Sequence, residues 1–201
     1  MSFSQDPNSN SEEKPEEKAT QVKVVVLGKS LVGKSALTYR FISDKFPEEH
    51  DTTVEDQYKT FANIDGEQFE LEILDTAGQD DYQTMLDTWI EFGNCFILVY
   101  SIDEMDSFKQ IKAKYDRICK LKANEPFSVI IAGNKCDLPD SSRKVSKVEA
   151  ESYAKNIDVP FLEVSALNRI NVKEAFMQVV RNYTSKKQKT SEKKSVGCPC
   201  F

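Results

Sequence analysis

Eight residues near the start of the sequence have the types and spacing to bind phosphate. Residues 28–35 read Gly-Lys-Ser-Leu-Val-Gly-Lys-Ser, which is the G-x-x-x-x-G-K-S pattern of a phosphate-binding loop. Glycines let such a loop curl around an anion, so that backbone N–H groups and the N-terminus of the next helix point toward it. Lys34 would reach the β- and γ-phosphates of a nucleoside triphosphate, and the Ser35 hydroxyl would ligate Mg²⁺. An ordinary glycine-containing turn is the alternative, and the pattern leaves the base open.

Two further polar segments could select that base. Residues 134–137 read Asn-Lys-Cys-Asp and follow an apolar run at 129–132. The Asp137 carboxylate could accept hydrogen bonds from N1–H and the 2-amino group of guanine, whereas adenine would leave it unpaired, which gives strong discrimination. Ser165-Ala166-Leu167 follows the next predicted strand, and the Ala166 N–H could donate to guanine O6. Each segment alone also suits a polar loop after a strand, but together with the phosphate-binding loop they predict a guanine nucleotide.

The elements that must position these residues alternate between strand and helix. Asp65-Gly66 is a hairpin signal between two alternating runs, and Ser146 with Glu149 forms a capping box at a helix start. Strands are predicted at 22–27, 58–64, 68–74, 95–100, 129–132 and 161–164, a loop at 46–54, and helices at 34–43, at 107–121, from 146 and at 171–184. The order βαββαβαβαβα, which includes a helix without predicted bounds between the strands at 68–74 and 95–100, predicts an α/β fold of the P-loop NTPase type, with a six-stranded, mostly parallel sheet, one antiparallel edge strand and helices on both faces. Ligands bind such sheets at the carboxyl ends of the strands.

Composition divides the 201 residues into three parts. We expect a disordered N-terminal extension at 1–20, one nucleotide-binding domain at 21–185 and a basic tail at 186–201. The formal net charge of −6 argues against a nucleic-acid-binding function that depends on positive charge. We therefore expect no nucleic-acid partner, and we expect a monomer.

The cysteines and the last residues bear on location. The five cysteines match neither a disulfide framework nor a zinc site, and we interpret Cys95, Cys119 and Cys136 as structural. The sequence shows no secretory signal and no run of about 18 apolar residues, as a membrane-spanning helix needs. Ser2 stands where myristoylation requires glycine.

The C-terminal Cys198-Pro199-Cys200-Phe201 predicts prenylation of Cys198, and the final Phe favours a geranylgeranyl group. Lysines in the tail would add attraction to an anionic membrane. We expect the cytoplasmic face of a membrane, the plasma membrane in particular. A disordered basic tail with incidental cysteines is the alternative.

The sequence resembles the Ras-type small GTPases from Val22 to about Ser185 and at its last four residues. Ile73-Leu74 precedes Asp75 where Rho and Rab proteins place a Trp, and the helical insert of Rho proteins is absent, so the chain is similar to the Ras branch. Its residues 54–58 resemble the Ras effector segment. The motifs that carry the resemblance are residues 28–35, Thr53, Asp75-Thr76-Ala77-Gly78-Gln79, residues 134–137 and residues 165–167.

This resemblance implies a switch that binds GTP and GDP with Mg²⁺ and hydrolyses GTP. Ser35 and Thr53 would ligate Mg²⁺ and Asp75 would hold a coordinating water; Gly78 would donate its N–H to the γ-phosphate, and Gln79 would orient the attacking water. With Lys34, the residues Gln79, Thr53 and Gly78 form the implied catalytic set. The implied nucleotide contacts are Gly28, Ser30, Leu31, Val32, Gly33, Lys34, Ser35, Ala36, Phe46 against the guanine ring, Thr53, Gly78, Asn134, Lys135, Asp137, Ser165, Ala166 and Leu167.

The resemblance also implies regulated turnover. Hydrolysis would release segments 48–58 and 76–86, and effectors would detect that change. Turnover alone should be about 10⁻⁴–10⁻³ s⁻¹, and an activating protein that supplies an arginine should raise it roughly 10⁵-fold. An exchange factor, an activating protein and effectors are the implied partners. A P-loop kinase that uses ATP, and a nucleotide-binding scaffold with little or no turnover, are the alternatives.

Two positions depart from the family pattern. Ser30 stands where Ras has glycine, and its side chain could obstruct both an activator's arginine and the catalytic glutamine, which predicts reduced sensitivity to Ras-type activators. His50 and Thr52 replace the usual Tyr and Pro. His50 is either a pH-sensitive element of the switch or a solvated loop residue.

Overall fold

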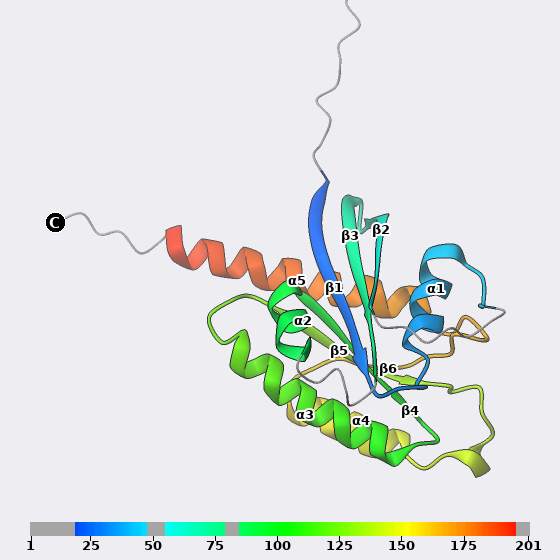
Figure 1. Cartoon of the computed structure of the whole chain (residues 1–201). Helices are drawn as coiled ribbons and strands as arrows, with labels where there is room; N and C mark the ends of the chain where they lie inside the picture. The colour runs from blue at the N-terminus through cyan, green and yellow to red at the C-terminus, as the bar shows by residue number, and fades with distance from the viewer. Residues whose placement is uncertain (1–18, 48–54, 79–84, 196–201) are drawn as a thin grey trace, which may run out of the picture.

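The computed structural model describes residues 19–47, 55–78 and 85–195, with side chains as far as Thr190. Its centre is a six-stranded sheet in the order β2-β3-β1-β4-β5-β6 (Figure 1). The strands are β1 (Thr20–Gly28), β2 (Glu55–Ile64), β3 (Glu67–Thr76), β4 (Cys95–Ser101), β5 (Ser128–Asn134) and β6 (Phe161–Glu163). Only the edge strand β2 runs antiparallel to its neighbour, β3. The predicted fold and its antiparallel edge strand are confirmed.

Helices cover both faces of this sheet because its central strands are apolar on both sides. Along β1, Val24 and Val26 belong to one hydrophobic cluster, while Val25 and Leu27 belong to the other. The first cluster contains residues of α1 (Lys34–Ser43) and α5 (Val172–Ser195). The second contains residues of α2 (Leu86–Phe92), α3 (Met105–Leu121) and α4 (Lys147–Asn156). A short 3₁₀ helix, η2 (Asp140–Ser142), precedes α4.

Two local signals have the predicted structures. Asp65 and Gly66 both have positive φ, 54° and 94°, as a two-residue hairpin turn requires, and they join paired residues Ile64 and Glu67. The Ser146 hydroxyl accepts a hydrogen bond of 3.1 Å from the Glu149 N–H and so caps α4. Each signal acts within a few residues and therefore needs no tertiary contact.

The last helix is longer than the sequence predicted. We placed its end near 184, but α5 continues to Ser195, and its last turns extend away from the sheet (Figure 1). The added residues up to Thr190 are exposed, so no apolar periodicity marks them as helical. Lys186 and Lys187 lie over the rings of Phe127 and Tyr183, at 5.7 and 5.9 Å. The basic tail predicted at 186–201 is thus helical as far as Ser195. The disorder predicted for 1–20 is wrong at Thr20, which begins β1 because it pairs with Phe69 of β3, and residues 1–18 lie outside the described residues. No helix in the described part of the chain has both the length and the apolarity to cross a lipid bilayer.

Candidate functional site

The turn between β1 and α1 has the shape that an anion-binding loop requires. Leu31 and Gly33 have positive φ, 65° and 92°, so the backbone reverses its curvature before the helix begins at Lys34. A side chain at Gly33 would put a Cβ 2.4 Å from the Asn134 amide nitrogen, so only glycine fits there. No side chain of the described residues caps the N-terminus of α1. Its first N–H groups therefore suit a ligand, which is one of the ways such groups are satisfied.

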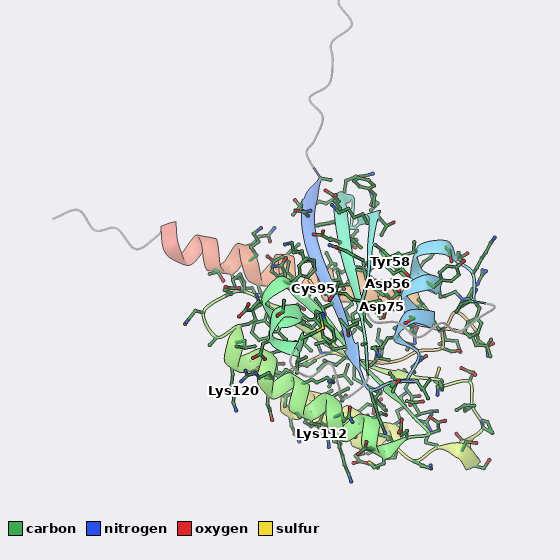
Figure 2. All side chains as sticks on the ribbon, viewed as in Figure 1. Asp56, Tyr58, Asp75, Cys95, Lys112 and Lys120 are labelled. Atoms are coloured by element: carbon green, nitrogen blue, oxygen red, sulfur yellow. The ribbon has the colours of Figure 1, made fainter. Side chains whose placement is uncertain are left out.

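A buried cation and a buried anion lie beside this loop. Lys34 is 6% exposed and donates to the Lys29 carbonyl at 3.0 Å, and Asp75 is fully buried at the end of β3. Pairing of β1 with β3 places Asp75 opposite Val26, while Figure 2 shows Asp56 and Tyr58 of β2 on its other side. The sequence predicted a strand at 68–74 that ends just before Asp75, but it could not predict how deeply this side chain is buried.

Burial disfavours the charged form of both side chains and therefore shifts both pKa values. It lowers the pKa of Lys34 to about 8, although the charge of Asp75 opposes the shift. It raises the pKa of Asp75 to about 6, which the Ser35 hydroxyl and the charge of Lys34 oppose. Neither Asp75 oxygen accepts a hydrogen bond of ordinary geometry within the described residues. A buried carboxylate in this condition suits a cation or a metal-bound water.

The chain's donor set fits Mg²⁺ in particular. Mg²⁺ usually takes one or two protein oxygens and completes its shell with phosphate oxygens and water. The Ser35 and Asp75 side chains interact at the phosphate-binding loop, and among the described residues no group of three or more His, Cys, Asp or Glu could form an all-protein metal site. The arrangement therefore suits an ion that arrives with a nucleotide. Thr53, the other predicted ligand, lies outside the described residues.

Asn134 joins the phosphate-binding loop to the predicted base-binding segments. It is 2% exposed at the end of β5. Its amide donates to the Val32 carbonyl at 2.8 Å, and its side-chain oxygen accepts from the Ala166 N–H at 3.4 Å. The Ser165 hydroxyl donates to the Asp137 carboxylate, and Lys135 has a positive φ of 65°. Segments separated by 102 residues in the sequence thus share one hydrogen-bonded framework.

The remaining predicted residues have mixed placements. Gly78 lies against the phosphate-binding loop: its carbonyl accepts from the Ser30 N–H at 2.9 Å, and an added Cβ would be 2.3 Å from the Ser30 nitrogen. Gly28 packs as closely, since its Cβ would be 2.2 Å from the Val99 carbonyl oxygen. Ala36 is buried in α1, whereas the Leu31 and Leu167 side chains are 87% and 53% exposed. Gln79, like His50, lies outside the described residues.

Sequence reasoning missed two groups beside the site. Lys29 pairs with Glu104 and, at 3.0 Å, with Asp106, which ties the phosphate-binding loop to the start of α3. Arg40 of α1 lies over the ring of Phe46, at 5.7 Å, and contacts the segment after β6. The only sequence signal for Arg40 is a charged residue within the stretch that forms α1, close to apolar residues. No local pattern names the partner of either cation.

Comparison with known proteins decides the family. Residues 23–185 match the model of the Ras family. The chain is 44% identical over 163 residues to Ras-like protein rasB of Dictyostelium discoideum, an alignment that covers 81% of this chain and 82% of the relative. The chain belongs to the Ras family. Ras-like proteins rasC and rasS of the same organism are 44% and 41% identical over 160 and 173 residues, which are 80% and 86% of this chain and 85% and 89% of theirs.

Membership of the Ras family confirms the resemblance and settles the class of activity. This Ras-family protein is a small GTPase, a GTP-binding switch that hydrolyses GTP to GDP and phosphate. The alternative of an ATP-using kinase is therefore rejected, and GTP hydrolysis in the family argues against a scaffold with little or no turnover. Guanine nucleotide is its ligand, and regulation by other proteins is general in the family.

Proposed function

We propose that this Ras-family GTPase is a slow, Mg²⁺-dependent switch that signals to effectors from the cytoplasmic face of the plasma membrane. The observation that carries the proposal is the position of Asn134, which bonds to the phosphate-binding loop with one side-chain atom and to Ala166 with the other. A single buried residue thereby sets the distance between a triphosphate site and a base site. The switch depends on both, since the base holds the nucleotide while the γ-phosphate is lost.

In this proposal the base site selects guanine through Asp137, with Ala166 donating to O6 and Phe46 packing on the ring. The Ser165 hydroxyl holds the Asp137 carboxylate in place. Asn134 and Lys135 belong to the same pocket. The Lys135 Nζ lies 3.9 Å from the Asp103 carboxylate and so connects the pocket to the segment after β4.

The phosphate site holds the triphosphate with backbone N–H groups of residues 31–36 and with Lys34. Ser35 and Thr53 would ligate Mg²⁺, and Asp75 would hold one of its waters. When bound, Mg²⁺ neutralises negative charge on the β- and γ-phosphates. Lys34 supplies a second positive charge from a buried position, where electrostatic interactions are stronger than in water.

The switch follows from the contact between Gly78 and the phosphate-binding loop. The Gly78 carbonyl bonds to the Ser30 N–H, which keeps Gly78 beside the phosphate-binding loop, and in this proposal its own N–H donates to the γ-phosphate. Gln79 orients the attacking water, and loss of the γ-phosphate frees segments 48–58 and 76–86 for effectors to distinguish. Turnover alone is slow, and an activating protein and an exchange factor set the balance of the two states.

In this proposal the C-terminal part attaches the switch to a membrane. Lys186, Lys187 and Lys189 are exposed on the last turns of α5, where each contributes up to about 1 kcal/mol of attraction to an anionic surface. A prenyl group on Cys198 supplies the second signal, since one lipid chain alone anchors weakly.

Exchange of the base-selecting carboxylate tests the base site. Asp137→Asn replaces an acceptor with a group that also donates, which suits xanthine, because xanthine carries an oxygen in place of the 2-amino group. We expect GTP affinity to fall and XTP affinity to rise. Asp140→Asn, at a fully exposed carboxylate three residues away, is the matched control. Unchanged preference in Asp137→Asn contradicts the base site.

Cell fractionation tests the membrane part separately. Cys198→Ser should move the protein from the membrane to the soluble fraction, while Cys200→Ser should leave it at the membrane. Equal distributions of the two variants contradict prenylation at Cys198.

A further inference from the structure

Arg40 is a buried cation at the last turn of α1. It is 7% exposed, and it is the only arginine among the buried residues of the described chain. In the described part of the chain, its hydrogen bonds go to backbone carbonyl oxygens, and no carboxylate pairs with it. Removing a guanidinium from water is expensive unless its donors are satisfied. The carbonyls that satisfy it are therefore held firmly in return.

Two of these carbonyls belong to the proposed guanine-binding segment. The Arg40 Nε donates to the Ala166 carbonyl at 2.7 Å, and Nη2 donates to the Leu167 carbonyl at 2.9 Å. The planar guanidinium presents these donors in a fixed fork. It thereby restrains two successive peptide groups of a segment that lies 126 residues away in the sequence.

The other contacts of Arg40 connect the same side chain to the rest of the pocket. Its Nη1 donates to the Asp44 carbonyl at 3.1 Å, at the end of α1. Its guanidinium lies 5.7 Å from the centre of the Phe46 ring, within the range of a cation–π contact. One side chain therefore touches the proposed ring-packing residue and the backbone that carries the proposed O6 donor.

The Ala166 N–H needs such support because its other restraint is weak. Its hydrogen bond to Asn134 is 3.4 Å long, at the outer limit of a useful bond. The N–H can thus turn from Asn134 toward a ligand, but its direction depends on how firmly the Ala166 carbonyl is restrained. The hydrogen bond from Arg40 supplies that restraint.

We propose that Arg40 is a positioning residue for guanine recognition, which fixes the Ala166–Leu167 backbone so that the Ala166 N–H points at O6 of the base. The inference rests on the proposed function, in which Ala166 is the O6 donor. Arg40 does not touch the nucleotide; it acts through the backbone that does.

Release rates of three diphosphates from the full-length protein test this role. GDP carries every recognition group, IDP lacks the 2-amino group, and 6-thio-GDP replaces O6 with sulfur, a weak acceptor. Arg40→Met should accelerate GDP release about tenfold, which corresponds to about 1.4 kcal/mol. It should leave 6-thio-GDP release almost unchanged, and release of IDP should accelerate as much as that of GDP because IDP keeps O6.

Two further variants exclude a merely structural explanation. Arg169→Met removes an exposed arginine that donates to the same Asp44 carbonyl and pairs with the Asp44 carboxylate. It is not among the donors to the Ala166 and Leu167 carbonyls given above, so it should leave all three rates unchanged. Arg40→Lys keeps the charge but loses the fork, so its rates should lie between those of wild type and Arg40→Met. Because release is measured only from nucleotide-bound protein, an unfolded fraction does not enter the comparison.

The outcomes separate this inference from the proposed function. Equal acceleration for GDP, IDP and 6-thio-GDP in Arg40→Met means general loosening and overturns the inference, as does an unchanged GDP rate. If the wild-type protein releases GDP and 6-thio-GDP at the same rate, the O6 contact itself is absent and the proposed base site is overturned. Loss of discrimination confined to position 6 supports the role of Arg40.

Discussion

Replacing Asp75 with Asn should stabilise the nucleotide-free protein while removing its response to Mg²⁺. The carboxylate is fully buried, and burial raises its pKa from 3.8 to about 6. Between these values the folded protein binds more protons than the unfolded chain, so wild-type stability falls as the pH rises through this window. Asparagine has nearly the shape of the neutral carboxyl group and carries no charge at any pH. The stability of the variant therefore does not fall as the pH rises through this window.

The size of the effect follows from the two pKa values. Relative to wild type, Asp75→Asn should gain about 1.5 kcal/mol at pH 5 and about 3 kcal/mol at pH 7.5, because from pH 5 to about 6 the folded wild type still holds a proton that the unfolded chain has already lost. The attraction between Asp75 and Lys34 is already contained in the pKa of Asp75, so it needs no separate correction.

Urea unfolding of nucleotide-free protein in EDTA, at pH 5, 6 and 7.5, measures these differences. Adding GDP with Mg²⁺ should then stabilise the wild type further, whereas the variant should gain only what GDP gives in EDTA. Asp140→Asn, at a fully exposed position, controls for loss of a negative charge. A stability difference that stays constant from pH 5 to pH 7.5 would refute the reasoning, since burial of the charged form would then not be its cause.

Three other outcomes are expected. Ser30→Gly should increase stimulation by a Ras-type activating protein in single-turnover assays; stimulation already complete with Ser30 in place would show that this side chain obstructs nothing. Gly78→Ala should speed GTP release more than GDP release, because its Cβ would meet the Ser30 nitrogen at 2.3 Å. Gly66→Ala is also strained, because its φ is +94°, but its Cβ meets nothing within 4 Å and it lies in the turn between β2 and β3, so it should keep the ratio of the two rates. Trp89, the only tryptophan, donates to Glu55 at 2.6 Å and joins α2 to the first residue of β2, so its fluorescence should change during one round of hydrolysis. Glu55→Gln should reduce that change, and emission that stays constant throughout would mean that this link does not depend on the nucleotide.

Patterns that act over a few residues were predictable from the sequence. The turn at Asp65-Gly66 and the cap at Ser146 depend on backbone conformation and on a hydrogen bond three residues away. The central strands were recognisable because β4 and β5 are apolar along nearly their whole length. From such elements, the alternation of strand and helix suffices to predict the sheet and the edge at which ligands bind.

The end of α5 was not predictable in the same way. A helix that packs on a sheet shows itself by apolar residues on one face, and that signal stops near Tyr183, the last residue of the hydrophobic cluster. The exposed residues that follow continue the helix without adding to the core.

The family, the fold and the order of the nucleotide-binding motifs were predictable from residue types and their spacing along the chain. How those motifs are held depends on contacts that form only when the chain folds. Asn134 meets Val32 across 102 residues, and Arg40 meets Ala166 across 126. The charges of Lys34 and Asp75 are likewise perturbed only because folding removes both side chains from water. Contacts between distant segments and the desolvation that accompanies them depend on which surfaces come together, and no local pattern encodes that.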